Sequence, residues 1–130
     1  MMAPELTILI YAALLAFVQF ALYAVPGVLQ MGIGYAAGPR DEERLPTGIA
    51  GRLRRAYYNH LETVPLFAIA VIVLVITGKT SSTTVLTAQI YLAARILYVP
   101  AYASGLPWLR SLIWTVATGA IVFLLVLAVA

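Results

Sequence analysis

The chain has 130 residues, of which 63% are hydrophobic and 10% are charged, and its formal net charge is +3. A soluble domain has about 45–50% apolar and about 25% charged residues, so this composition excludes an ordinary water-soluble domain and predicts a membrane protein with three or four spans. The absence of cysteine excludes disulfides and cysteine metal sites, and a single histidine argues against a structural zinc.

The first expected span covers residues 5–35. Residues 7–25 are apolar and numerous enough to cross about 30 Å of hydrocarbon, with Gln19 as the one strongly polar interior residue. Gln19 is expected to bond a neighbouring helix, and lining a cavity is the alternative. Pro26 and Gly27 are expected to kink or relax this helix. No basic segment with a cleavage pattern precedes the span, so a removable signal peptide is not expected.

A polar loop leads into the second expected span, residues 49–77, which begins with the densest polar segment of the chain, residues 52–65. Four polar residues there are spaced by three, four and three positions: Arg52, Arg55, Asn59 and Glu62. On a helix that turns by about 100° per residue, these side chains fall within an arc of about 80°. The span therefore combines a polar face at its start with a wholly apolar second half.

The third expected span, residues 83–103, carries a second polar stripe. Its members are spaced by four, three and four positions: Tyr91, Arg95, Tyr98 and Tyr102. A tight turn follows, in which Pro107 suits the first position of a helix. The fourth expected span covers residues 108–130 and has Arg110 in its first turn. Its remaining residues indicate plain membrane packing.

Four spans would place both termini on the same side of the membrane. Seven of the eight lysine and arginine residues flank or lean toward the first and third loops, and only Lys79 flanks the second. The positive-inside rule then predicts that the first and third loops are cytoplasmic and both termini are outside. Both polar stripes would lie toward the cytoplasmic face.

The charges within the spans favour a ligand site over purely structural ion pairs. Glu62 is expected to pair with Arg55 or Arg95, because a charged residue in a span needs a partner. The two stripes together with Arg110 contain four arginines against this one carboxylate, however, and the surplus guanidiniums would suit an anionic ligand. Four neighbours have simpler expected roles. Arg54 is expected to be a headgroup anchor, and Tyr57 and Tyr58 are expected to be interfacial belt residues. His60 is expected to be an interhelical hydrogen-bonder, and a base is the alternative.

The polar segment of the second span resembles the signature of the MAPEG family, the membrane-associated proteins in eicosanoid and glutathione metabolism. The matching residues are Arg52-x-x-Arg55-Ala-x-x-Asn59-x-x-Glu62-x-x-Pro65. A second motif, Arg95-x-x-Tyr98-x-x-x-Tyr102 followed by Arg110, resembles the third-helix motif and the catalytic arginine of that family. The similarity extends over the whole chain, whose short loops look like those of bacterial members.

The resemblance implies an all-α membrane protein, a bundle of four transmembrane helices that assembles as a homotrimer in the bacterial inner membrane. Glutathione would be the co-substrate and would bind between neighbouring protomers, and an apolar small-molecule electrophile would arrive through the membrane lipids. The residues implied to bind glutathione are Arg52, Arg55, Asn59, Glu62, Arg95, Tyr98 and Tyr102. Arg110 would be the catalytic residue and would face the sulfur, where a guanidinium favours thiolate over thiol.

Three functional hypotheses follow. The first is a glutathione-dependent transferase or peroxidase-like enzyme that activates a thiol as thiolate and conjugates or reduces an apolar electrophile. The second is a non-catalytic membrane protein of the same fold that binds lipid or a partner complex through the same basic pocket. The third is a small transporter or channel, which the clustering of polar groups at one face argues against. Neither a metal nor a nucleic-acid partner is expected.

Overall fold

The computed structural model describes all residues, Met1–Ala130, and contains five helices and no strands. Four of the helices are long: α1 (Pro4–Met31), α3 (Gly48–Ile76), α4 (Ser82–Ala103) and α5 (Pro107–Val129). The fifth, α2 (Ile33–Ala37), is a short helix between α1 and α3. All four long helices are long and apolar enough to cross a membrane. The chain is therefore an all-α integral membrane protein, as the sequence predicted.

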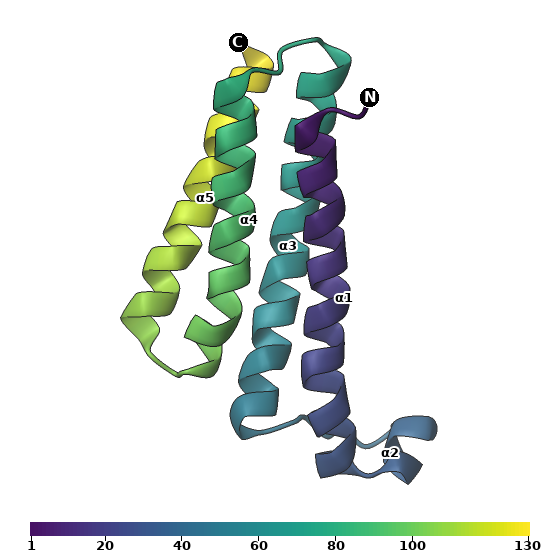
Figure 1. Ribbon diagram of the computed structural model, residues 1–130. Coiled ribbons are helices and arrows are strands. Elements are labelled where there is room, and N and C mark those ends of the chain that lie inside the picture. Colours follow the sequence, from purple (N-terminus) through teal and green to yellow (C-terminus); the bar gives the residue numbers. More distant parts are fainter.

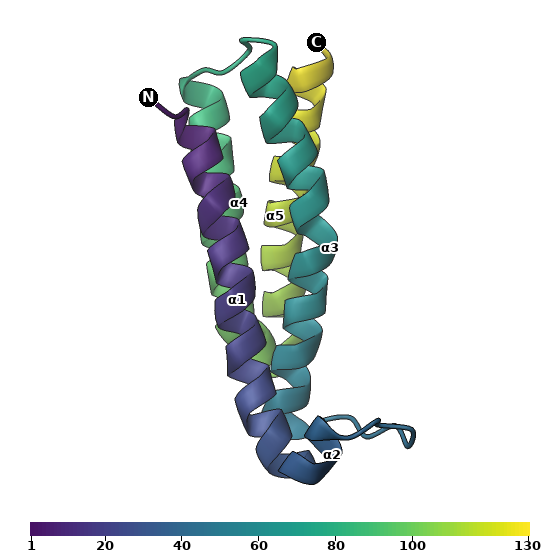
Figure 2. The ribbon, with the colours of Figure 1, turned by 90° about the vertical axis from the view of Figure 1, so that its right-hand side faces the viewer.

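The long helices form an up-and-down bundle made of two antiparallel pairs, α1 with α3 and α4 with α5 (Figure 1). The view in Figure 2 shows that the pairs lie against each other, with α3 beside α5 and α4 beside α1. Both termini lie at one end of the bundle, and the α4–α5 turn and α2 lie at the other.

The first long helix is shorter than expected. It ends at Met31 instead of residue 35, because Gly32 takes a φ of +94° that L side chains rarely adopt. The chain then forms α2 and returns to the bundle at Thr47. The Gln30 side chain bonds both the N–H and the carbonyl of Thr47. Gln30 donates from Nε2 to the Thr47 carbonyl at 3.1 Å and accepts from the Thr47 N–H at 2.9 Å. Thr47 occupies the N-cap position of α3, but its hydroxyl makes no capping bond.

The interior of the bundle is built mainly from small residues. Five of its fully buried alanines are Ala12, Ala70, Ala88, Ala117 and Ala56. Between them lies a stack of two aromatic rings, Phe67 of α3 and Tyr91 of α4, whose centroids are 4.0 Å apart at an interplanar angle of 21°. Lipid tails are as apolar as leucine, so membrane helices associate through such close packing and not through the hydrophobic effect.

Polar contacts join the two helix pairs at the end that carries the termini. The carboxylate of Glu5, which is fully buried, accepts a hydrogen bond from the Thr84 hydroxyl of α4. Thr84 also forms a capping box with Ser81 at the start of α4. Lys79 donates to the Ala128 carbonyl near the end of α5 at 2.9 Å. Sequence reasoning had not singled out Glu5.

The expected role of Gln19 is wrong for the single protomer. Its side chain is 1% exposed, yet neither its amide nitrogen nor its amide oxygen has a hydrogen-bond partner. The helix nonetheless continues through this position and through Pro26 to Met31.

Candidate functional site

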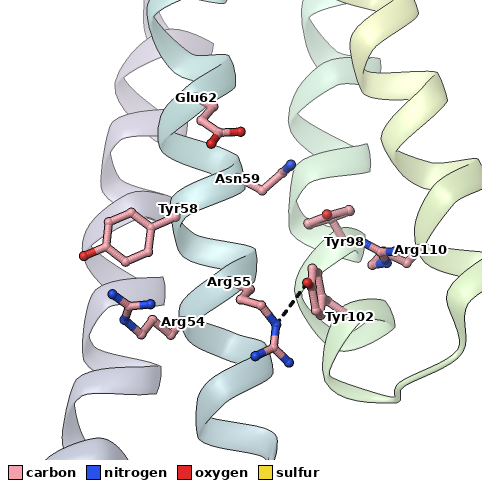
Figure 3. Close-up of a pocket in the computed structure, with 8 residues that line it drawn as sticks. All are labelled: Arg54, Arg55, Tyr58, Asn59, Glu62, Tyr98, Tyr102 and Arg110. Carbon is pink, nitrogen blue, oxygen red and sulfur yellow. Dashed lines mark hydrogen bonds between the residues drawn. The ribbon is translucent and has the colours of Figure 1, made fainter. Parts of the chain in front are cut away.

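The polar faces of α3, α4 and α5 meet in an open pocket of about 520 Å³ (Figure 3). Its lining residues are Arg54, Arg55, Tyr58, Asn59, Glu62, Tyr98, Tyr102 and Arg110. The first five come from α3 and form one wall, whereas the two tyrosines come from α4 and Arg110 from α5. The pocket therefore unites six of the eight residues that the sequence predicted as site residues.

Tyr102 organises the cationic groups of the pocket. Arg55 donates from Nε to the Tyr102 hydroxyl at 3.2 Å, which is the bond drawn in Figure 3. The Arg110 guanidinium lies over the Tyr102 ring, 4.8 Å from its centroid, and Tyr98 meets the same ring edge-on at 5.6 Å. Contact with the negative face of an aromatic ring stabilises a cation. Tyr102 thus positions the guanidiniums of Arg55 and Arg110, which carry like charges, beside the same pocket.

Arg52 lies beside the pocket and supports the turn that begins α5. It donates from Nη1 to the Ala103 carbonyl at 3.1 Å, and its guanidinium packs against Gly105 so closely that a Cβ there would lie 3.3 Å from it. An adjoining hollow of about 200 Å³ is shared with Arg55, Tyr102 and Arg110. Arg52 therefore fixes the turn from which Arg110 projects.

Glu62 does not form the ion pair that the sequence suggested. The only ion pair of the chain joins Arg44 and Glu42 in the exposed loop, at 3.4 Å. Glu62 is exposed on the pocket wall and is bonded to neither Arg55 nor Arg95. A carboxylate and several guanidiniums therefore face one open space without neutralising one another directly.

Arg95 was predicted to contact the ligand, but it lies behind the pocket wall and does not line the pocket. It is fully buried and donates to His60 Nδ1 at 3.2 Å and to Asn59 Oδ1 at 3.0 Å. Its guanidinium also lies 4.3 Å from the centroid of the Tyr98 ring. His60 is the interhelical hydrogen-bonder that the sequence predicted, because it also bonds the Ala12 carbonyl of α1 at 2.8 Å.

Two pocket residues were missed by sequence reasoning. Arg54 was expected to be a headgroup anchor and Tyr58 a belt residue, yet both line the pocket, with the Arg54 guanidinium 4.7 Å from the Tyr58 ring centroid. The spacing of Arg54, Tyr58 and Glu62 at i, i+4 and i+8 was the available signal, since such residues form a row along a helix. That row runs beside the predicted stripe and widens the polar face.

The other face of α3 forms an apolar groove with α1. The groove has a volume of about 410 Å³, and its lining residues are Ala13, Ala16, Phe17, Phe20, Tyr57, Leu61 and Val64. Tyr57 packs against Tyr23 and Phe20 of α1, with ring centroids 5.3 and 5.9 Å apart. Tyr57 thus lines the groove and Tyr58 lines the polar pocket, and their rings meet edge to face between the two, with centroids 5.2 Å apart.

Four apolar helices long enough to span a membrane, with an open basic pocket at the end away from the termini, define a small polytopic membrane protein. The sequence profile of the MAPEG family matches residues 8–130, and the chain therefore belongs to the MAPEG family. This family includes glutathione-dependent transferases and peroxidases. A search of curated proteins finds no match to the chain.

Proposed function

We propose that the protein is a membrane-bound, glutathione-dependent transferase or peroxidase-like enzyme that activates a thiol as thiolate. The observation that carries this proposal is the charge pattern of the pocket, in which three arginines share one space with a single unpaired carboxylate, Glu62. Glutathione offers the complementary pattern, with two carboxylates, one amino group and a thiol. A volume of about 520 Å³ also lies within the range of small-molecule pockets, about 300–1,000 Å³.

The proposed binding roles follow from the contacts of each side chain. Arg55 is oriented by the Tyr102 hydroxyl, so its terminal nitrogens remain available for a ligand carboxylate. Glu62 would accept hydrogen bonds from the ligand ammonium group. Tyr98 and Tyr102 supply walls and hydroxyls on the opposite side of the pocket.

Arg110 is the proposed catalytic residue. It stacks on Tyr102 and lines the main pocket and the hollows that adjoin it, so a bound sulfur in this region would lie near a fixed cation. The thiol proton would leave to water, and the thiolate lone pair would form a C–S bond as the leaving group departs with its bonding electrons. With a hydroperoxide, the thiolate would attack the terminal oxygen and break the O–O bond, which gives a sulfenate and an alcohol. After the sulfenate takes up a proton from water, the sulfenic acid would react with a second thiol to yield a disulfide and water.

The proposal includes assembly and orientation. A homotrimer would close the open side of the pocket with a neighbouring protomer, and an apolar electrophile could enter from the lipid through a groove such as that between α1 and α3. The arginine bias supports an orientation in which the first and third loops are cytoplasmic, and the short loops, which look like those of bacterial members of the family, support a bacterial inner membrane.

A titration of the purified full-length protein with glutathione tests the proposal. Binding is expected by calorimetry, together with ultraviolet thiolate absorbance of the bound ligand and turnover of an aryl halide. Glu62→Gln should weaken glutathione binding by about tenfold or more, since a hydrogen bond to a charged group is worth about 1.5–3 kcal/mol. A glutathione analogue without the amino group is the matched control and should bind both proteins alike. Binding without thiolate or turnover would instead support a non-catalytic protein that binds lipid or a partner complex through this pocket.

A further inference from the structure

Behind the pocket wall, a buried chain of hydrogen bonds runs from α1 through α3 and α4 and back to α3. Its members are the Ala12 carbonyl, His60, Arg95 and Asn59. We propose that His60 and Arg95 are positioning residues that turn the Asn59 amide so that its N–H groups face the pocket, which makes this part of the wall selective for a hydrogen-bond acceptor. The proposal deepens the proposed function and rests on it only where glutathione is used as the probe.

The first step is the tautomer of His60. A backbone carbonyl can only accept a hydrogen bond, so the contact of 2.8 Å with the Ala12 oxygen requires the hydrogen on Nε2. The Nε–H of Arg95 can only donate, so its contact of 3.2 Å requires a lone pair on His60 Nδ1. Both nitrogens are thereby engaged, and the imidazole is the neutral Nε2–H form. His60 therefore links the Ala12 carbonyl of α1 to the Arg95 side chain of α4 and fixes the direction of that side chain, and it is not available as a base.

The second step is the orientation of Arg95. Its guanidinium is planar and rigid, so a bond that fixes Nε also fixes the direction of the terminal nitrogens. Nη1 points to Asn59 Oδ1 at 3.0 Å, and the ring of Tyr98 packs against the same guanidinium at 4.3 Å. The side chain is fully buried and so cannot swing into water. The bond of Arg95 to His60 thus also fixes the position of the Arg95 nitrogen that binds Asn59.

The third step is the amide of Asn59. A guanidinium has donors only, so the atom that faces Arg95 must be the amide oxygen. The amide NH₂, which donates and does not accept, is left for the pocket that Asn59 lines. A ligand carboxylate or carbonyl would be accepted at this position and an ammonium group would be rejected. Glu62, three residues further along the same helix, offers the opposite preference, so the two residues set the order of ligand groups along α3.

The composition of the chain makes this arrangement measurable, because His60 is its only histidine and Asn59 its only asparagine. Selective ¹⁵N labelling of these two residue types in the full-length protein therefore reports single sites by NMR, without any ligand. In the wild type, Nε2 should carry the proton, Nδ1 should carry none, and the Asn59 amide should give one defined pair of signals.

Two substitutions of His60 form a matched pair. Glutamine can donate to the Ala12 carbonyl and accept from Arg95, whereas leucine can do neither. His60→Gln should keep the Asn59 signals and bind glutathione within about twofold of the wild type. His60→Leu should shift or broaden the Asn59 signals and weaken binding by about five- to tenfold, which corresponds to one lost hydrogen bond of about 1 kcal/mol.

A third variant separates positioning from stability. Asn59→Asp keeps an acceptor for Arg95 but replaces the pocket-facing donors with an acceptor. Its melting temperature should not fall, while glutathione binding should weaken by more than about tenfold, because a repelled carboxylate loses a hydrogen bond to a donor. If His60→Leu fails to fold, Arg95→Lys serves instead. Its single nitrogen cannot hold both His60 and Asn59 in this geometry, and the Asn59 signals should shift.

Three results would overturn the proposal: a proton on His60 Nδ1, unchanged Asn59 signals in both His60→Leu and Arg95→Lys, or wild-type glutathione affinity in Asn59→Asp. A wild type that does not bind glutathione would refute the proposed function alone. The ligand-free signals of the labelled residues would still decide whether His60 and Arg95 position the amide.

Discussion

Replacing Arg110 by alanine should remove the cation that stabilises the bound thiolate while leaving most of the binding contacts in place. In the proposed function, glutathione would be bound mainly by Arg55 and its neighbours on α3, whereas Arg110 projects from the start of α5 on the opposite side of the pocket (Figure 3). An interaction made mainly with the reacting form lowers turnover more than it lowers affinity.

The size of the effect follows from the position of Arg110. Two unit charges about 4 Å apart interact by roughly 1 kcal/mol in water and by roughly 4 kcal/mol at an effective dielectric constant of about 20. Arg110 is half-buried beside an open pocket, so we expect about 1.4–2.8 kcal/mol, which lowers the pKa of the bound thiol by about one to two units. From a free value of about 8.5, the thiolate fraction at pH 7 would rise from about 3% to between about 24% and 76%.

The assay is the absorbance of the bound thiolate against pH, measured together with turnover and the binding constant. Arg110→Ala should return the thiol pKa to about 8.5 and lower turnover at pH 7 by about eight- to twenty-fivefold. The defect should shrink above about pH 9, where the thiol ionises without help. Arg110→Lys keeps a cation and should recover part of the activity, whereas Arg55→Ala should weaken binding first. An unchanged thiol pKa in Arg110→Ala, or a defect of the same size at every pH, would show that Arg110 does not act on the sulfur.

Three further predictions concern packing, orientation and assembly. Gly51→Ala should destabilise the protein by about 1–3 kcal/mol and so lower its melting temperature in detergent, because the new Cβ would lie 2.7 Å from the Pro46 carbonyl oxygen. Gly119→Ala is the control and should not lower the melting temperature, since its Cβ meets nothing within 4 Å. Reporter fusions at Gly38 and at the C-terminus should give opposite signals, and equal signals would contradict the four-span orientation. Native mass measurement in mild detergent should give three chains, and a stable monomer that still binds glutathione would contradict a site shared between protomers.

The fold was predictable because its signals are local. Long apolar runs separated by polar turns mark spanning helices, and Pro107 begins α5 as its sequence context indicated. The end of α1 was not predictable from hydropathy, since residues 33–37 are also apolar. The positive φ of Gly32 separates α1 from α2, and the sequence does not reveal which of several nearby glycines adopts such a conformation.

The pocket was predictable in part because spacing places residues on one helix face. Arg55, Asn59 and Glu62 line the pocket together, as their spacing indicated. Spacing along one helix does not show, however, which residues of a face reach the pocket surface and which are buried by the neighbouring helices. Tyr98 and Arg95 belong to the same stripe, yet Tyr98 lines the pocket while Arg95 is enclosed behind it. That difference depends on how α4 packs against α3, which is a property of the assembled bundle.

The bond between Glu5 and Thr84 sets a condition on how the chain is made. Its two residues are separated by 79 positions, so the carboxylate in the first turn of α1 is synthesised long before the hydroxyl that binds it. Until α4 emerges from the ribosome, Glu5 must stay in the headgroup region, where the positive end of its own helix dipole stabilises it. The carboxylate can be withdrawn from water only when the second helix pair arrives. This polar contact of the first helix therefore cannot form before the start of α4 has been made, and a nascent chain halted after α3 would leave that end of the bundle open.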